Sequence, residues 1–394
     1  MSIELMNKDR FIYLDNNATT KVAPQVVEAM LPFFGEDYGN PSSGHFLGAR
    51  AARVVSEARE QTASLLNCRP EEIIYTSCGT ESDVTAILAA LKSFPGKRHL
   101  VTTAVEHPAV KNLCENLTEI TGREYRLTTL SVDREGRIDL REFEDSLCDD
   151  TVLATIMWAN NETGVIFPVE ELARIARKYE VLFHTDAVQA VGKIPLDMRE
   201  IPVDYLSMSG HKFHAPKGTG ALYVRQGAPF YPFFPGGGQE NGRRSGTENT
   251  ACIVGLGQAC ELAAANLKGI DNSIRYLRNK LEKGLQEVIP GAAVNGGGSK
   301  RLSNTCSIRI PGVRGDELVR RFDDLGICVS AGAACKAGIC QPSHVLQAMN
   351  VPAGYGTVRL SLSIYSTEAE VDYLIKVFPD IVKGKGTRTS PILY

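Results

Sequence analysis

The chain has 394 residues, of which 43% are hydrophobic and 23% are charged, and its formal net charge is −3. This composition is ordinary for a soluble globular protein, and the length favours one large domain with a smaller companion. The small negative charge predicts neither a nucleic-acid-binding surface nor a polybasic membrane signal. The sequence contains no run of about 18 apolar residues, so no membrane span is predicted.

The start of the chain, MSIELMNKDR, has neither a long apolar stretch nor a small-residue cleavage site. We therefore expect no secretion signal and a cytoplasmic location. The ten cysteines are scattered along the chain. In that compartment they are expected to be reduced thiols rather than partners in a disulfide framework.

From about residue 70 to 225, short apolar, β-branched runs alternate with amphipathic helical patterns, one of which opens at Pro168. The predicted strands are Glu72–Thr76, Leu100–Ala104, Val152–Trp158, Val181–Thr185, Tyr205–Ser209 and Ala221–Val224. This alternation predicts an α/β fold with a mostly parallel central sheet and helices on both faces. Ligands of such a fold bind at the carboxyl ends of the strands.

After Val224 the pattern changes to a Gly- and Arg-rich loop, Pro232–Thr250, and then to a helix with Leu277 and Leu281 on its inner face. Shorter strands and helices follow and predict a smaller α/β C-terminal domain. Within it, Ser330–Pro342 is rich in small residues and predicts a mobile loop. The expected division is a large domain of residues 16–260 and a small domain of residues 1–15 and 261–394.

The tetrapeptide Ser209-Gly210-His211-Lys212 directly follows a strand that reads as buried. Lysine is seldom buried, so a lysine held at such a strand end is a candidate for forming a Schiff base. A surface lysine in a turn is the alternative explanation. The tetrapeptide alone does not decide between them.

Two other strand ends favour the Schiff base. Asp186 lies where an acid can pair with the protonated pyridine nitrogen of pyridoxal phosphate (PLP), and Gln189 can donate to its phenolic oxygen. Thr80 and Asp83 have the spacing of a capping box, and the free N–H groups of a helix start also bind phosphate. Helix capping alone would explain Asp186 or Thr80 separately. An acid, a lysine and a phosphate seat in one domain together indicate PLP.

The usual nucleotide and zinc motifs are missing: there is no P-loop, no HExxH and no GxGxxG after a strand. We therefore expect no metal ligands.

Several motifs resemble those of the NifS/IscS-type cysteine desulfurases, which are fold-type I PLP enzymes of the class V aminotransferase family. The resemblance spans about residues 11 to 385. The motifs are YLDNNATT, GNPSS, TSCGTES, VEHPAV, WANNETG, FHTDAVQAVGK, SGHKFHAPKG, GGGQENGRRSGTEN and GTVRLSLS. The resemblance implies a homodimer with each active site at the subunit interface.

The resemblance also implies a role for each site residue. The catalytic residues would be Lys212, which forms the internal aldimine, His107, which stacks on the ring as an acid/base, and Cys335. Asn161 and Arg359 would bind the substrate carboxylate, for which the planar guanidinium is suited. The implied cofactor-binding residues are Gly79, Thr80, His107, Asn161, Asp186, Gln189, Ser209, His211, Lys212 and, from the partner subunit, Thr247.

The implied reaction removes sulfur from L-cysteine through a PLP ketimine, forms a persulfide on Cys335 and releases L-alanine. A thiolate suits that attack. The sulfur would pass to an iron–sulfur scaffold or to another acceptor, as in nitrogenase maturation or tRNA thiolation, and the sequence leaves this choice open. The loop around Cys335 departs from the serine-rich SSGSACTS pattern usual in the family, since three hydroxyls are missing. Lys336 follows Cys335 and is expected to lower its pKa, and Cys340 stands where the family tends to have a leucine.

Three rival functions remain within or near this family. A selenocysteine lyase, a cysteine-sulfinate-type relative or a plain aminotransferase would not need Cys335. A PLP-binding scaffold that only docks partners is a rival from another class. The intact set of Lys212, His107 and Arg359 argues against it, since such a scaffold has no chemical need of them.

Overall fold

The large sheet has seven strands and carries most of the site. The computed structural model describes residues 11–331, 333–336, 339–352 and 354–384. In spatial order the strands are β2 (Ile73–Thr76), β8 (Gly220–Val224), β7 (Tyr205–Ser209), β6 (Leu182–Asp186), β5 (Thr151–Thr155), β3 (His99–Thr103) and β4 (Arg126–Leu130). Only β8 runs antiparallel to its neighbours. The prediction of a mostly parallel sheet is confirmed.

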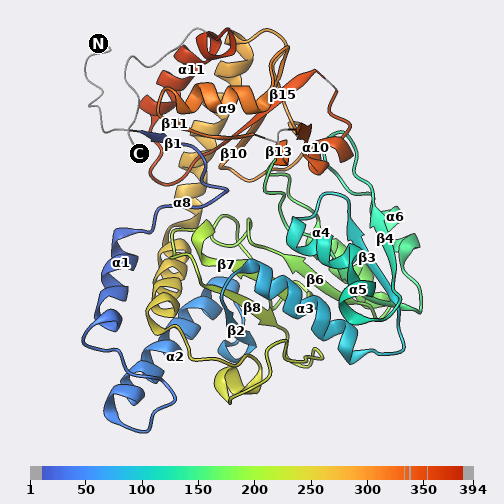
Figure 1. Ribbon diagram of the computed structural model, residues 1–394, viewed down its shortest axis with the longest axis vertical. Coiled ribbons are helices and arrows are strands. Elements are labelled where there is room, and N and C mark those ends of the chain that lie inside the picture. Colours follow the sequence, from blue (N-terminus) through green and yellow to red (C-terminus); the bar gives the residue numbers. More distant parts are fainter. Residues whose placement is uncertain (1–10, 332, 337–338, 353, 385–394) are drawn as a thin grey trace.

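Helices cover both faces of this sheet (Figure 1), because its strands are apolar on both sides. One face packs on α2 (Phe46–Leu66), α6 (Leu140–Ser146), α7 (Val169–Lys178) and the start of α8 (Thr250–Val288). The other face packs on α3 (Gly79–Ser93), α4 (Pro108–Glu115) and α5 (Leu117–Thr121). The remaining elements of this half are α1 (Pro24–Met30), η2 (Leu31–Phe34), η3 (Pro70–Glu72), η4 (Gly210–Lys212) and η5 (Gln239–Gly242).

A second, smaller sheet lies above the first (Figure 1). Its order is β12 (Ser330–Ala331), β15 (Tyr355–Ser361), β10 (Thr305–Pro311) and β9 (Ala293–Val294), all antiparallel. Two strand pairs accompany it, β1 (Ile12–Tyr13) with β11 (Ile327–Cys328) and β13 (Ala333–Lys336) with β14 (Ile339–Pro342). The helices of this half are α9 (Gly315–Asp323), α10 (His344–Ala348) and α11 (Glu368–Val382).

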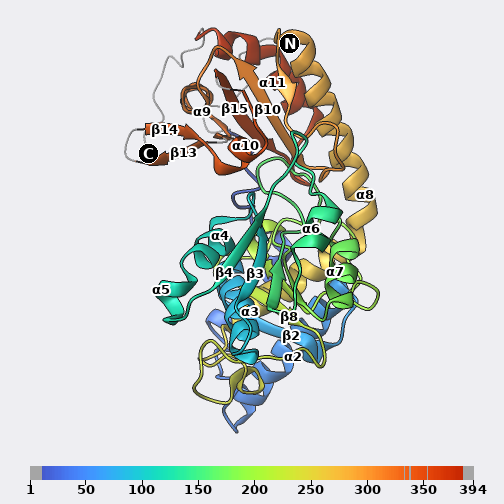
Figure 2. The same cartoon turned by 90° about the vertical axis from the view of Figure 1, so that its right-hand side faces the viewer.

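The helix α8 runs alongside both halves in the two views (Figures 1 and 2). Leu256 and Cys260 near its start belong to the apolar core of the large sheet, whereas Leu281 and Leu285 near its end belong to a separate core under the small sheet. The division expected at residue 260 therefore falls inside one continuous helix. It stays a prediction.

The sequence patterns located the strands well but missed some elements. Every predicted strand overlaps a strand of the large sheet, with shifts of up to a few residues at the ends. The edge strand β4 was missed because its RLTTL sequence is half-exposed and only weakly apolar. The loop predicted for Ser330–Pro342 was wrong for its described residues, since they include β12, β13 and β14. The mobility expected of this segment stays a prediction.

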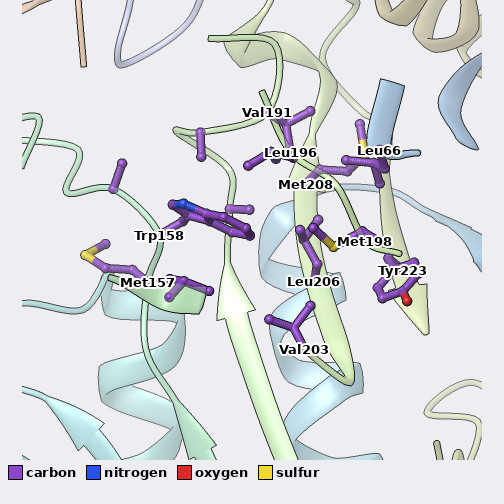
Figure 3. Close-up of a cluster of buried hydrophobic side chains, with 14 of the residues drawn as sticks. Leu66, Met157, Trp158, Val191, Leu196, Met198, Val203, Leu206, Met208 and Tyr223 are labelled. Atoms are coloured by element: carbon purple, nitrogen blue, oxygen red, sulfur yellow. The ribbon is translucent and has the colours of Figure 1, made fainter. Parts of the chain in front are cut away.

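Trp158 belongs to the apolar core of the large sheet. Figure 3 shows its ring among buried apolar side chains, with Val191 and Leu196 nearby, and it is 5% exposed. Among the residues described, no helix has the length and apolarity needed to cross a membrane.

Candidate active site

One cavity of about 380 Å³ lies at the carboxyl ends of the large sheet's parallel strands, under β15 of the small sheet. Its lining joins residues from distant parts of the chain, including nearly every residue that the sequence predicted. The predicted residues in the lining are Gly79, Thr80, His107, Asn161, Asp186, Gln189, Ser209, His211, Lys212 and Arg359.

Lys212 follows β7 in the short helix η4, and its amine points to the N-terminal segment of the chain. Its Nζ donates hydrogen bonds of 2.8 Å to the carbonyl oxygens of Asn17 and Ala18. Burial and the nearby charge of Arg359 lower the pKa of Lys212 to about 8, although Asp186 opposes them. A sizeable fraction of this amine is therefore neutral near physiological pH, as a nucleophilic lysine requires.

An acid that ends β6 and a histidine that follows β3 face the same cavity. Asp186 ends β6 and accepts a hydrogen bond from the Val188 amide at 2.9 Å, while burial raises its pKa. His107 caps α4, its Nδ1 accepting from the Ala109 amide at 3.2 Å. Burial lowers the pKa of His107, so its ring is mainly neutral at pH 7 and can accept a proton.

The start of α3 forms one end of the cavity, and the capping box expected there was wrong. The helix begins at Gly79, and its N-cap, Cys78, makes no side-chain cap hydrogen bond. A Cβ at position 79 would lie 2.7 Å from Val188 Cγ2, so only glycine fits there without a shift. Nearby, the buried Ser209 hydroxyl has no hydrogen-bond partner. The N–H groups at the start of α3 are uncapped, Gly79 has no side chain to shield them, and the Ser209 hydroxyl is unpartnered. These groups together suit a phosphate.

The opposite end of the cavity holds Arg359, which is 9% exposed. Its Nη1 donates to the Asn161 carbonyl oxygen at 3.1 Å, and its Nη2 lies 2.7 Å from Asp15 Oδ1. Its Nε is buried without a partner. A buried guanidinium with an unpartnered N–H has the chemistry that suits a carboxylate. Sequence reasoning missed Asp15, because its contact with Arg359 spans 344 residues.

Two predicted residues do not line this cavity. Thr247 lies at a separate depression with Thr76, Gly218 and Arg244. For Cys335 the structure gives the backbone alone, in β13, where it pairs with Cys340 across the hairpin. Neither placement tests the role expected of the residue.

The segment Asp15–Ala18 is the main part of the site that sequence reasoning left without a role. Asn17 Nδ2 donates to the Asn161 carbonyl oxygen at 3.1 Å, and the Asn17 carbonyl oxygen accepts from Gln189 Nε2 at 3.0 Å and from Lys212. These contacts tie both ends of the cavity together. The YLDNNATT motif was the one sequence feature that pointed to this segment, and the spacing of its residues does not indicate a chemical role.

The family model described as aminotransferase class V matches residues 12–374. A cysteine desulfurase of Trichormus azollae is 51% identical over 94% of this chain and 93% of its own length. The cysteine desulfurase NifS of Azotobacter vinelandii is 48% identical over 94% and 92% of the two chains. A solved structure named a NifS-like protein superposes with a TM-score of 0.89 at 40% identity, covering 95% and 100% of the two chains.

Proposed function

Since this chain belongs to the aminotransferase class V family and is a PLP-dependent cysteine desulfurase, we propose how its own residues divide that work. One observation carries the proposal. A half-buried lysine of lowered pKa and a buried arginine with an open N–H line the same cavity. The first suits a carbonyl cofactor, and the second suits the carboxylate of an amino acid.

The residues present fit PLP. The start of α3 with Gly79, together with the unpartnered Ser209 hydroxyl and His211, would hold the phosphate. Asp186 would pair with the pyridine nitrogen and Gln189 with the phenolic oxygen. Bound there, PLP supplies an electron sink for the bonds around the substrate α-carbon.

At the other end, Arg359 and Asn161 would hold the substrate carboxylate. Lys212 and His107, whose pKa values are lowered by burial, would accept and return protons near neutral pH. The Cys335 thiolate would take the sulfur atom. L-cysteine and the Cys335 thiol become L-alanine and a Cys335 persulfide, so no outside oxidant or reductant is needed.

We also propose a cytoplasmic homodimer that passes its sulfur to an iron–sulfur scaffold or a related acceptor. Thr247 lies outside the cavity of its own chain, so a partner's cavity is where it would act. Large apolar side chains are exposed between α1 and α2, where Phe34 is 66%, Tyr38 71% and Phe46 79% exposed. Such a group of exposed aromatic side chains favours burial against another subunit.

The test is turnover of L-cysteine by the purified holoenzyme and by its Cys335→Ala variant. The parent should release one alanine for each sulfur transferred and carry a persulfide on the Cys335 peptide. Cys335→Ala should retain PLP but lose turnover, whereas a matched Cys328→Ala variant should keep it. Full turnover by Cys335→Ala would instead favour a selenocysteine lyase or an aminotransferase.

A further inference from the structure

Lys193 lies directly behind the cavity, and the proposed function gives it no role. Its Nζ donates to Gln189 Oε1 at 2.6 Å and lies 3.5 Å from Asn17 Oδ1. Lys193 lines a second cavity of about 330 Å³, between α8 and the loops next to Lys212, whereas Gln189 lines the active-site cavity. Lys212 lines both cavities, and Gln189 connects Lys193 to the active-site cavity by a hydrogen bond.

The ammonium of Lys193 decides how the Gln189 amide is turned. An amide has an acceptor side and a donor side of nearly the same shape, whereas an ammonium group can only donate. The side facing Lys193 must then be Oε1, which leaves Nε2 on the other side. There Nε2 gives one hydrogen to the Asn17 carbonyl oxygen at 3.0 Å. Its second hydrogen is free for an acceptor in the cavity.

Asn17 is itself held firmly, so it cannot follow a turning amide. Its side-chain oxygen accepts from Asn304 Nδ2 at 2.9 Å, and its side-chain nitrogen donates to Thr305 Oγ1 at 2.9 Å. Asn17 is 1% exposed and Gln189 is 4% exposed. A turned Gln189 would place Oε1 against the Asn17 carbonyl oxygen, which is repulsive.

The charge of Lys193 acts in a crowded electrostatic setting. Burial, then Lys212 and Arg359, lower its pKa to about 7. The other titratable groups near it are His211 and His214, and Asp271 of α8 lines the same rear cavity. A neutral amine could also accept a hydrogen bond, so losing this proton would relax the constraint on Gln189.

We propose that Lys193 is a positioning residue that holds the Gln189 amide donor toward the cavity and thereby sets the ionisation of the cofactor bound at Lys212. The inference rests on the proposed assignment of Gln189 to the phenolic oxygen. An N–H donor at that oxygen disfavours retention of the proton shared between the cofactor and Lys212. When Gln189 no longer presents this donor, the proton is retained to higher pH.

The experiment is a pH titration of the visible absorbance of the holoenzyme. Lys193→Met removes the donor and the charge, and should raise the midpoint by about one pH unit. Gln189→Leu should raise it as well. The double variant Lys193→Met/Gln189→Leu should match Gln189→Leu alone, because Lys193 acts through Gln189. Lys217→Met removes an exposed lysine five residues after Lys212 and should leave the midpoint unchanged.

Each outcome decides one part of the inference. If Gln189→Leu shifts the midpoint and Lys193→Met does not, Lys193 has no positioning role and the proposed site stands. Shifts that add in the double variant would show that Lys193 acts independently of Gln189, which also overturns the inference. An unchanged midpoint in Gln189→Leu removes the assignment of Gln189 itself. If Lys193→Met fails to retain PLP, Lys193→Gln, which keeps a neutral donor, takes its place in the same cycle.

Discussion

The two sides of the active-site cavity hold their charged groups in different ways. On the large-sheet side, Asp186 and Lys212 follow directly from strand ends, so the local chain sets their positions. On the small-sheet side, Arg359 lies within β15, and its orientation depends on Asp15 and on the Asn161 carbonyl oxygen. On the cofactor side, strand ends set the backbone positions of these residues, and Asn17 and Ala18 then fix the Lys212 amine. On the substrate side, the orientation of the key side chain depends on distant segments alone.

Removal of Lys212 is expected to have the largest effect and tests the cofactor side alone. Lys212→Ala should lower turnover by about 10²–10⁴-fold or more, the range for a positioned proton-transfer group, and should hold PLP only non-covalently. Reduction with borohydride followed by mass spectrometry should find the cofactor on the Lys212 peptide of the yellow parent protein only. Lys217→Ala is the matched control. A colourless, fully active preparation would rule out the assignment.

Removal of Arg359 tests the substrate side. Arg359→Ala should weaken L-cysteine binding by roughly 2–4 kcal/mol, the scale for losing one partner of a charge-assisted, partly buried pair. The PLP content should not change, because Arg359 is assigned to the substrate. Binding is measured by titration of the visible spectrum with L-cysteine. Arg309→Ala, on the adjacent strand β10, removes a similar charge and should have little effect. Loss of PLP in Arg359→Ala would contradict the assignment.

A mixed dimer tests whether the cofactor side is completed by a second subunit. One subunit carries Lys212→Ala and the other Thr247→Ala. If Thr247 serves the partner's phosphate, both lesions fall in one site and the other site is intact, so about half of the activity remains. If each lesion acts within its own chain, both sites are damaged. The measurement is the activity of doubly tagged dimers purified through both tags.

The smallest effect is expected at the hairpin that carries Cys335. The register places Cys335 opposite Cys340. Opposite residues of an antiparallel pair have Cα atoms about 4.5–5.5 Å apart, which is within the range of a disulfide. Cys340 could therefore attack Cys335 Sγ in the persulfide, forming a disulfide and releasing sulfide.

Tryptic mass spectrometry after turnover without reductant checks this possibility. A reactive Cys340 leaves a Cys335–Cys340 disulfide, and Cys340→Ala then accumulates the persulfide for longer than the parent does. If the parent and the variant hold the persulfide equally long and no disulfide forms, Cys340 only replaces the apolar leucine of related sequences. That outcome is the simpler explanation and would leave sulfur transfer to Cys335 unchanged.

The difference between the two sides explains what the sequence could predict. Strand ends such as Thr185–Asp186 and Ser209 were found because apolar, β-branched runs mark buried strands, and the functional residue comes next in the chain. Asp15 and Asn17 were not found, because their partners lie far away in the sequence. Lys193 was not found, because its role depends on the orientation of the Gln189 side-chain amide. Short-range patterns carry no information on such pairs.

The hairpin was missed for another reason. Small residues such as those from Ala331 to Ala337 have weak strand propensity, so the pattern favoured a loop. Pairing of β13 with β14 overrode this local preference. The same limit applied to the capping box at Thr80, where the helix began two residues earlier than its capping signature indicated.

The helix α8 restricts how the cavity can open. It has 39 residues, about 60 Å at 1.5 Å per residue, and it packs in both apolar cores. A continuous helix resists sharp bending unless its backbone hydrogen bonds break. The helix α8 is therefore a rigid connection between the two halves and not a hinge. The two halves are held at one spacing along this helix, and the walls of the cavity keep their distance from each other.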